Sequence, residues 1–177
     1  FKKRCSELWR HLQWGRWDRK TPKGLKSQTR STLLELAGDH PDRIHTILLS
    51  FEAIFGTLRN GLAEPPRRKT PNKERKTGLY RYAKSRTKRL ITALEDSLEH
   101  SSIAWTVLFA SREPEAFIRS CHTQLLKEGR HNPETSHFDT FRQTADFSCT
   151  DPKSLEQALL KLGSKRNLKV VSINYDQ

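Results

Sequence analysis

The sequence predicts an α/β fold: a three-layer α-β-α sandwich with a mixed sheet in residues 79–177, preceded by an α-helical N-terminal part. Three observations lead to this prediction. Residues 79–177 alternate between segments with helical spacing of apolar residues and short apolar runs typical of strands. Residues 1–64 show helical spacing alone, and residues 65–78 have the Pro-rich, basic composition of a linker. We therefore expect three parts with these boundaries.

The N-terminal part contains three predicted helices, at residues 3–14, 25–37 and 41–62. The third has the strongest periodicity, because its apolar residues fall at spacings of three and four. These residues are Ile44, Ile47, Leu48, Phe51, Ile54, Phe55, Leu58 and Leu62. The Pro-rich segment that follows, residues 65–78, is expected to have no fixed structure without a partner.

The C-terminal part opens with a predicted helix over residues 79–99, on which Arg81, Lys84 and Lys88 share one face at spacings of three and seven. Residues 103–110 form a nearly continuous apolar run rich in β-branched and aromatic residues. Such a run predicts a strand that is buried on both faces of a sheet.

Four further elements complete this part. A helix is expected from Pro114 to Gly129, with Ser111 as its N-cap. Residues 141–147 alternate between apolar and polar side chains and predict a strand. Asp151 before a proline predicts the start of a helix, and residues 168–175 predict a last strand. Strands separated by helices favour a parallel or mixed sheet with helices on both faces.

The charge distribution points to a polyanionic partner. The formal net charge of the chain is +13, and residues 65–89 hold eleven Lys and Arg but one acidic residue. Such a block repels itself unless a polyanion neutralises it, and the nearest common polyanions are nucleic acid and the anionic membrane surface. No apolar run is long enough to span a membrane, so no membrane partner is expected.

The first candidate RNA-binding surface is the cation-rich stretch, since Arg and Lys contact phosphates. Its members are Arg67, Arg68, Lys69, Lys73, Arg75, Lys76, Arg81, Lys84, Arg86, Lys88 and Arg89. The alternative for these residues is a solvated helix face with a solubility tail. The second candidate is the cluster of Trp14, Arg16 and Trp17, in which aromatic rings can stack on unpaired bases. A protein core or interface is the commoner use of such tryptophans.

The third candidate is the turn Pro152-Lys153-Ser154, because a helix N-terminus offers free N–H groups to an anion. Its alternative is a simple helix cap.

The sequence contains no constellation typical of an enzyme. There is no phosphate-binding loop, no nucleophile elbow and no carboxylate pair spaced for acid–base chemistry. We expect no cofactor and no metal, because the histidine and cysteine residues lack the short spacing of zinc ligands. The residues considered were Cys121, His122, His131, His137, Asp139 and Cys149. Three scattered cysteines fit a reducing compartment, and Cys121 and Cys149 are expected to be buried and inert.

Four segments carry a resemblance to a known family: residues 90–95, 107–114, 122–126 and 151–159. Through them, residues 79–176 resemble the kink-turn-binding ribosomal-protein superfamily, and most of all the fungal protein subunits of ribonuclease P and RNase MRP. The resemblance implies a three-layer α-β-α fold. At the positions where the family's RNA-facing helix has Gly, Asn and a basic residue, this chain has Arg86, Lys88 and Thr92.

These observations predict a noncatalytic RNA-binding subunit of a ribonucleoprotein, with structured RNA and other protein subunits as partners. The resemblance implies ribonuclease P or RNase MRP, tRNA and rRNA processing, and a nuclear or nucleolar location; the residues alone allow nucleus or cytoplasm. Two alternatives stay open. One is a protein-interaction adaptor with a basic localisation segment, and the other is a DNA-binding replication or transfer protein.

Overall fold

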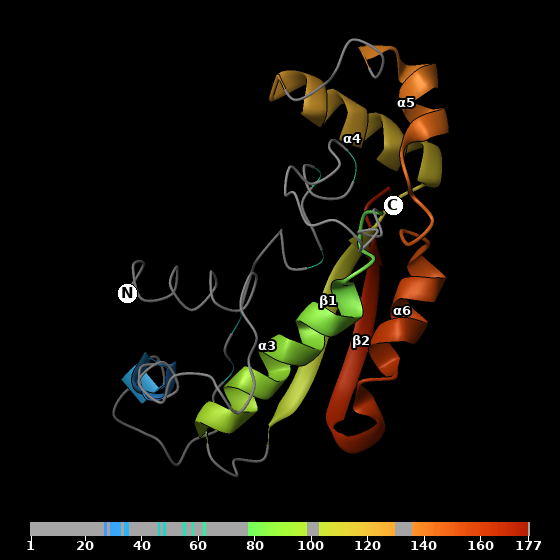
Figure 1. Ribbon diagram of the computed structural model, residues 1–177. Helices are drawn as coiled ribbons and strands as arrows, with labels where there is room; N and C mark the ends of the chain where they lie inside the picture. Colours follow the sequence, from blue (N-terminus) through green and yellow to red (C-terminus); the bar gives the residue numbers. More distant parts are fainter. Residues whose placement is uncertain are drawn as a thin grey trace, which may run out of the picture. The chain divides into compact units, whose positions relative to one another are not determined.

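The computed structural model describes residues 78–98, 103–129 and 136–176, and single positions before them. The earlier positions are residues 27, 29–32, 34–35, 46, 48, 55, 58 and 62. The described elements follow one another from an α-helix to a C-terminal strand (Figure 1). In order they are α3 (Ala83–Leu98), β1 (Ala104–Ser111), α4 (Pro114–Lys127), α5 (Phe138–Thr144), α6 (Pro152–Leu160), the 3-10 helix η4 (Gly163–Lys165) and β2 (Asn167–Asn174). The described fold is therefore α/β, as the sequence predicts.

The chain divides into two compact units. The first consists of Phe1–Ile54 and Ser85–Ile103, and the second of Phe55–Lys84 and Ala104–Gln177. In the first unit, residues 29–32 and 34–35 are helical, in agreement with the helix predicted over 25–37. The helices predicted over 3–14 and 41–62 lie outside the described residues, apart from single positions of the latter.

The sheet of the second unit consists of two parallel strands. β1 and β2 pair along their whole length, from Ala104 opposite Asn167 to Ser111 opposite Asn174. Parallel neighbours need a long crossover connection, and here α4, α5, α6 and η4 supply it. Both strands begin and end within one residue of the positions that their apolar runs predicted.

One face of this sheet carries the first core cluster. Phe109 of β1 and Val170 of β2 pack with Leu155 and Leu159 of α6, and Leu159 has no exposed surface. Leu155 and Leu159 are four residues apart on α6 and so lie on the same side of the helix. This side of α6 covers the strands. Burial of such apolar side chains is worth roughly 1.5–3 kcal/mol each.

A second cluster joins α4 to α5 and to the segment before α3. Phe141 and Leu79 are each 2% exposed and pack with Cys121 and Leu125 of α4. Tyr80 lies against both clusters, with its ring 6.0 Å from that of Phe117. The two clusters therefore share a border at the segment before α3.

The strand predicted over 141–147 is wrong, because most of these residues belong to α5. Phe138, Phe141 and Ala145 fall at spacings of three and four, and the first two place their rings within 5.6 Å and 5.0 Å of His122. The apolar–polar alternation that suggested a strand is equally compatible with this helical spacing over so short a segment. Burial of Phe141 against α4 decides in favour of the helix.

The helix predicted from Pro114 to Gly129 is confirmed, but its cap is not Ser111. Ser111 is the last residue of β1, and the carboxylate of Glu113 accepts hydrogen bonds from the N–H groups of Glu115 and Ala116, at 3.0 and 2.7 Å. Proline occupies the first turn, and Gly129 follows the end of α4 with φ of +62°. α6 begins as predicted, with the carboxylate of Asp151 accepting from Ser154 N at 2.8 Å.

α3 begins four residues later than predicted, because the segment before it is folded differently. Gly78 and Tyr80 have positive φ angles of +116° and +64°, which no helix accommodates. The N–H of Leu79 donates to the carbonyl of Asp146 at 3.2 Å, and that of Ala83 donates to Tyr80 at 2.8 Å. Across the described ranges, no helix has both the length and the apolar content needed to cross a membrane.

We expect Gly78→Ala to lower the free energy of unfolding by about 1–3 kcal/mol, because φ of +116° strains any residue with a Cβ. A Cβ at this position would also come within 2.8 Å of Asp146 Oδ2. Urea unfolding of the two purified proteins measures the difference. Gly129→Ala is the matched control, since its φ is also positive but no atom lies within 4 Å of the added Cβ. An equal loss of stability in the two variants would contradict the role assigned to the contact with Asp146.

Candidate RNA interface

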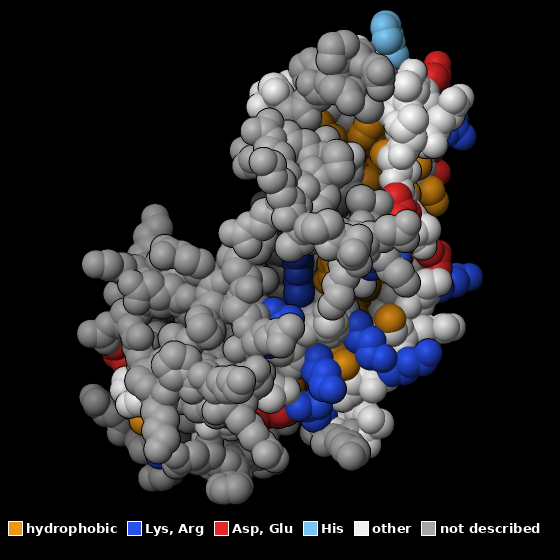
Figure 2. Space-filling view, in the orientation of Figure 1, with side chains coloured by type: hydrophobic (Ala, Val, Ile, Leu, Met, Phe, Trp, Pro, Cys, Tyr) orange, Lys and Arg blue, Asp and Glu red, His pale blue; other side chains and the backbone are white. Residues whose placement is uncertain are grey.

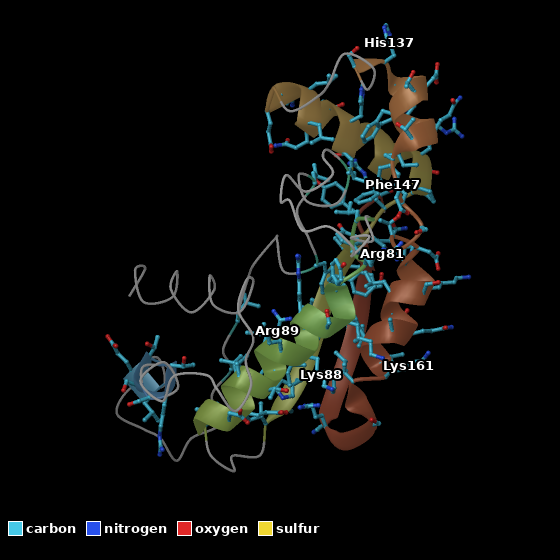
Figure 3. The ribbon with its side chains drawn as sticks, viewed as in Figure 1. Arg81, Lys88, Arg89, His137, Phe147 and Lys161 are labelled. Carbon is cyan, nitrogen blue, oxygen red and sulfur yellow. The ribbon has the colours of Figure 1, made fainter. Side chains whose placement is uncertain are left out.

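α3 presents two exposed cations on one side. Lys84 and Lys88 are exposed, whereas Thr87, Ile91 and Leu94 are buried along a neighbouring stripe of the helix. Residues four apart on a helix have Cβ atoms about 5–6 Å apart, so the two ammonium groups lie on the same face. Figure 3 shows Lys88 on this helix, and Figure 2 shows Lys and Arg side chains reaching the surface.

The two arginines of the same helix are placed differently. Arg86 and Arg89 are half-buried, and each interacts with other groups of the protein. Figure 3 labels Arg89 on the same helix as Lys88. The predicted cation cluster on α3 is therefore divided into two exposed lysines and two arginines that already have internal interactions.

Arg81 is not on the α3 face where the sequence placed it. It precedes the helix, and its Nη2 lies 3.3 Å from Oδ2 of Asp146 in a half-buried ion pair. The hydroxyl and the N–H of Ser148 both donate to the other oxygen of this carboxylate, at 2.6 and 3.0 Å. The prediction of a shared face for Arg81, Lys84 and Lys88 is therefore wrong for Arg81, whose charge is matched within the chain.

The N-terminus of α6 already holds an anion of its own. Asp151 accepts from Ser154 N, and Pro152 has no N–H to offer. Hydrogen bonds from Ser154 hold the pKa of Asp151 below its ordinary value, so this carboxylate remains charged at neutral pH. Of the predicted trio, Lys153 is the exposed cation that remains available to a ligand.

The other predicted contacts lie outside the described residues and stay predictions. They are Arg67, Arg68, Lys69, Lys73, Arg75 and Lys76 of the linker, with Trp14, Arg16 and Trp17 near the start of the chain.

The sequence missed a polar cluster at the carboxyl end of the sheet. Asp176 accepts from Arg112 Nε at 3.0 Å and from Glu113 N at 2.6 Å. The guanidinium of Arg112 also lies over the ring of Tyr175, 5.0 Å from its centroid. These partners are more than sixty residues apart, so only the pairing of β1 with β2 brings them together. In the sequence, Asp176 is a single acidic residue beside Tyr175, and nothing near it indicates a contact with Arg112.

The thiol and imidazole groups of α4 are part of the core. Burial raises the pKa of Cys121 to about 12, so its thiol stays protonated and inert, as predicted. Cys149 is only half-buried, with its Sγ 3.8 Å from the hydroxyl of Ser148, so its predicted burial is wrong. His122 Nε2 lies 3.1 Å from the carbonyl of Ser136. Among the residues that the structure describes, no three His, Cys, Asp or Glu side chains gather as metal ligands.

Comparison with known proteins gives no relative: no family model, no curated protein and no solved structure matches this chain. The function must therefore be inferred from the chain itself.

Four carboxylates predict how stability depends on pH. The pKa values of Glu113, Asp146, Asp151 and Asp176 all lie below their ordinary values, in each case mainly because N–H or O–H groups donate to the charged form. A lowered pKa in the folded state stabilises the fold above the ordinary values of 4.5 for Glu and 3.8 for Asp. This contribution disappears as pH falls through the lower, folded-state values.

We therefore expect urea midpoints to fall between pH 7 and pH 3, and to fall less for Asp176→Asn, which removes one contributing carboxylate. Asp139→Asn, at an exposed position of α5, is the matched control for the loss of one carboxylate. Identical pH profiles for Asp176→Asn and the wild type would refute the assigned hydrogen bonds.

Proposed function

We propose that this protein is a noncatalytic RNA-binding subunit of a ribonucleoprotein, of the kind found in ribonuclease P and RNase MRP. In this role it binds structured RNA beside other protein subunits in the nucleus, where such particles process tRNA and rRNA. The finer architecture belongs to the same proposal: residues 79–177 supply the sheet, with β1 and β2 parallel, and one helical layer of a three-layer α-β-α sandwich. The resemblance of residues 79–176 to the kink-turn-binding ribosomal-protein superfamily supports this proposal.

The observation that carries this proposal is the pair of exposed lysines on α3, directly after a strongly basic stretch. Residues 65–89 have a net charge of +10, and Lys84 and Lys88 project from the rigid end of this stretch. A helix fixes the separation of the two Cα atoms, so little backbone entropy is lost when phosphates bind. The linker before it can order on the same polyanion.

The pairing of Arg81 with Asp146 refines this proposal. A guanidinium that already forms an ion pair gains little from a phosphate, since it must first leave its carboxylate. We therefore assign the phosphate contacts of the described region to Lys84, Lys88 and Lys153, and a structural role to Arg81.

A protein-interaction adaptor is the second candidate. The observation that favours it is the exposure of large apolar side chains on the sheet, where Leu108 and Ile173 are each 53% exposed. The two functions are distinguished by salt, because phosphate contacts weaken steeply with ionic strength and apolar contacts do not.

We expect Lys84→Ala with Lys88→Ala to weaken binding to a structured RNA severalfold at 0.15 M salt. The slope of log affinity against log salt should become shallower by roughly 0.7–0.9 for each phosphate that a lysine no longer neutralises. Fluorescence anisotropy over a salt series measures both quantities, with a tRNA precursor as the probe and a duplex DNA as competitor.

The matched control is Lys127→Ala with Lys161→Ala, two exposed lysines that remove the same charge from α4 and from the end of α6. If this control and the α3 variant weaken RNA binding equally, net charge alone explains the binding and the site on α3 is wrong. Preference for duplex DNA over the RNA would support the DNA-binding alternative instead.

A further inference from the structure

The two-stranded sheet has one covered face and one outer face. Successive side chains of a strand point to opposite faces, and Val107, Phe109 and Val170 belong to the covered one. The outer face is defined here by the alternate positions of the paired strands, in register with one another. Its residues are Ala104, Thr106, Leu108 and Ala110 of β1, with Asn167, Lys169, Val171 and Ile173 of β2.

This outer face has an apolar centre that water contacts. Leu108 lies opposite Val171, and Ala110 lies opposite Ile173, so four apolar side chains adjoin one another. Leu108 and Ile173 are each 53% exposed. Parallel strands are almost always covered on both faces, because their connections place helices there and their apolar side chains face both ways. A helix packed on the outer face would therefore remove this apolar centre from water.

The dimensions of the outer face fit one helix. Two strands about 4.8 Å apart, with their side chains, are about as wide as an α-helix of 10–12 Å diameter. Eight residues of strand extend about 26 Å, which is the length of about 17 helical residues. A second copy of this face would bring no acidic side chain to Lys169, because the face itself carries none.

The charge of the outer face defines the chemistry of that helix. Lys169 is exposed toward the amino end of the strands, opposite Thr106, and no acidic residue occupies any position of the face. At the carboxyl end, the charge of Arg112 is already paired with Asp176, 3.0 Å away. The uncompensated charge is thus positive and lies at the amino end, where an acidic side chain of the covering helix would meet it.

The chain's own amphipathic segments fit this face less well. The helix predicted over residues 3–14 has Lys3, Arg4 and Arg10 around its apolar stripe, so its charge has the same sign as Lys169. Phe55 already packs in the second unit on the covered side, with its ring 6.2 Å from that of Phe109.

We propose that the outer face binds one amphipathic helix of a different protein, with an apolar stripe on the sheet and an Asp or Glu against Lys169. This helix would complete the sheet as a layer between helices. The inference uses none of the α3 lysines, so it stands or fails separately from RNA binding.

Photo-crosslinking from the outer face identifies the occupant directly. The full chain with Leu108→benzoylphenylalanine is expressed in its native cells and irradiated, and the crosslinked peptides are sequenced by mass spectrometry. We expect a peptide from another protein, with apolar residues at helical spacing and an acidic residue near one end. The control probe replaces Leu160, an apolar residue of α6 that is 47% exposed but lies off the sheet. The proposal is overturned by an adduct within this chain, an adduct to a second copy or to RNA, or no adduct above the control.

Binding of the crosslinked peptide, made synthetically, to the full chain then tests the chemistry. Leu108→Glu with Ile173→Glu should weaken binding roughly tenfold or more, and Leu160→Glu should leave it unchanged. The double variant Leu108→Thr with Ile173→Thr should also weaken binding. Because Thr has a high β propensity, this variant keeps the strands, so its weaker binding cannot be attributed to a folding defect. Lys169→Glu should weaken binding and recover when the acidic residue of the peptide becomes Lys. No change in the Thr pair, or no recovery in the charge exchange, would refute the proposed interactions.

Discussion

The described part of the second unit depends on how residues 78–81 are fixed to Asp146. The backbone carbonyl of Asp146 accepts from Leu79, and its carboxylate pairs with Arg81. Between these two bonds, Tyr80 adopts a left-handed conformation and places its ring against both core clusters. Strain at a non-glycine residue persists only where its surroundings over-determine it, and here two hydrogen-bonded neighbours and a partly buried ring do so. The start of α3, and so the direction of Lys84, follows from this contact.

Much of the C-terminal fold is predictable because its signals are local. A carboxylate followed by proline marks the start of α6, and the same logic places the start of α4 at Pro114, even though the capping group is Glu113 rather than Ser111. The two strands are apolar runs too short for helices. In each case the signal that predicts the element lies within a short stretch of sequence.

The errors share a different cause. α5 is a helix because Phe141 is buried against α4, and Arg81 is paired because Asp146 lies nearby in space, sixty-five residues on. Neither partner is visible in a short window of sequence. A cation drawn inward to a carboxylate and a cation left to bind phosphate look the same in composition. Charge counting therefore located the basic region but could not separate Arg81 from Lys84 and Lys88.

The same reasoning separates the two surfaces proposed for this protein. Exposed lysines cost nothing while they are solvated, so the α3 face is stable by itself, and the affinity for RNA that we propose would depend on counterion release. Exposed Leu108 and Ile173 are different, since apolar area in water carries a cost of about 25 cal/mol per Å² at any salt concentration. Raising the ionic strength should therefore weaken the first interaction and leave the second nearly unchanged. A subunit with both surfaces would keep its protein neighbour at a salt concentration that removes its RNA. This order of dissociation follows from the chemistry of the side chains on the two surfaces.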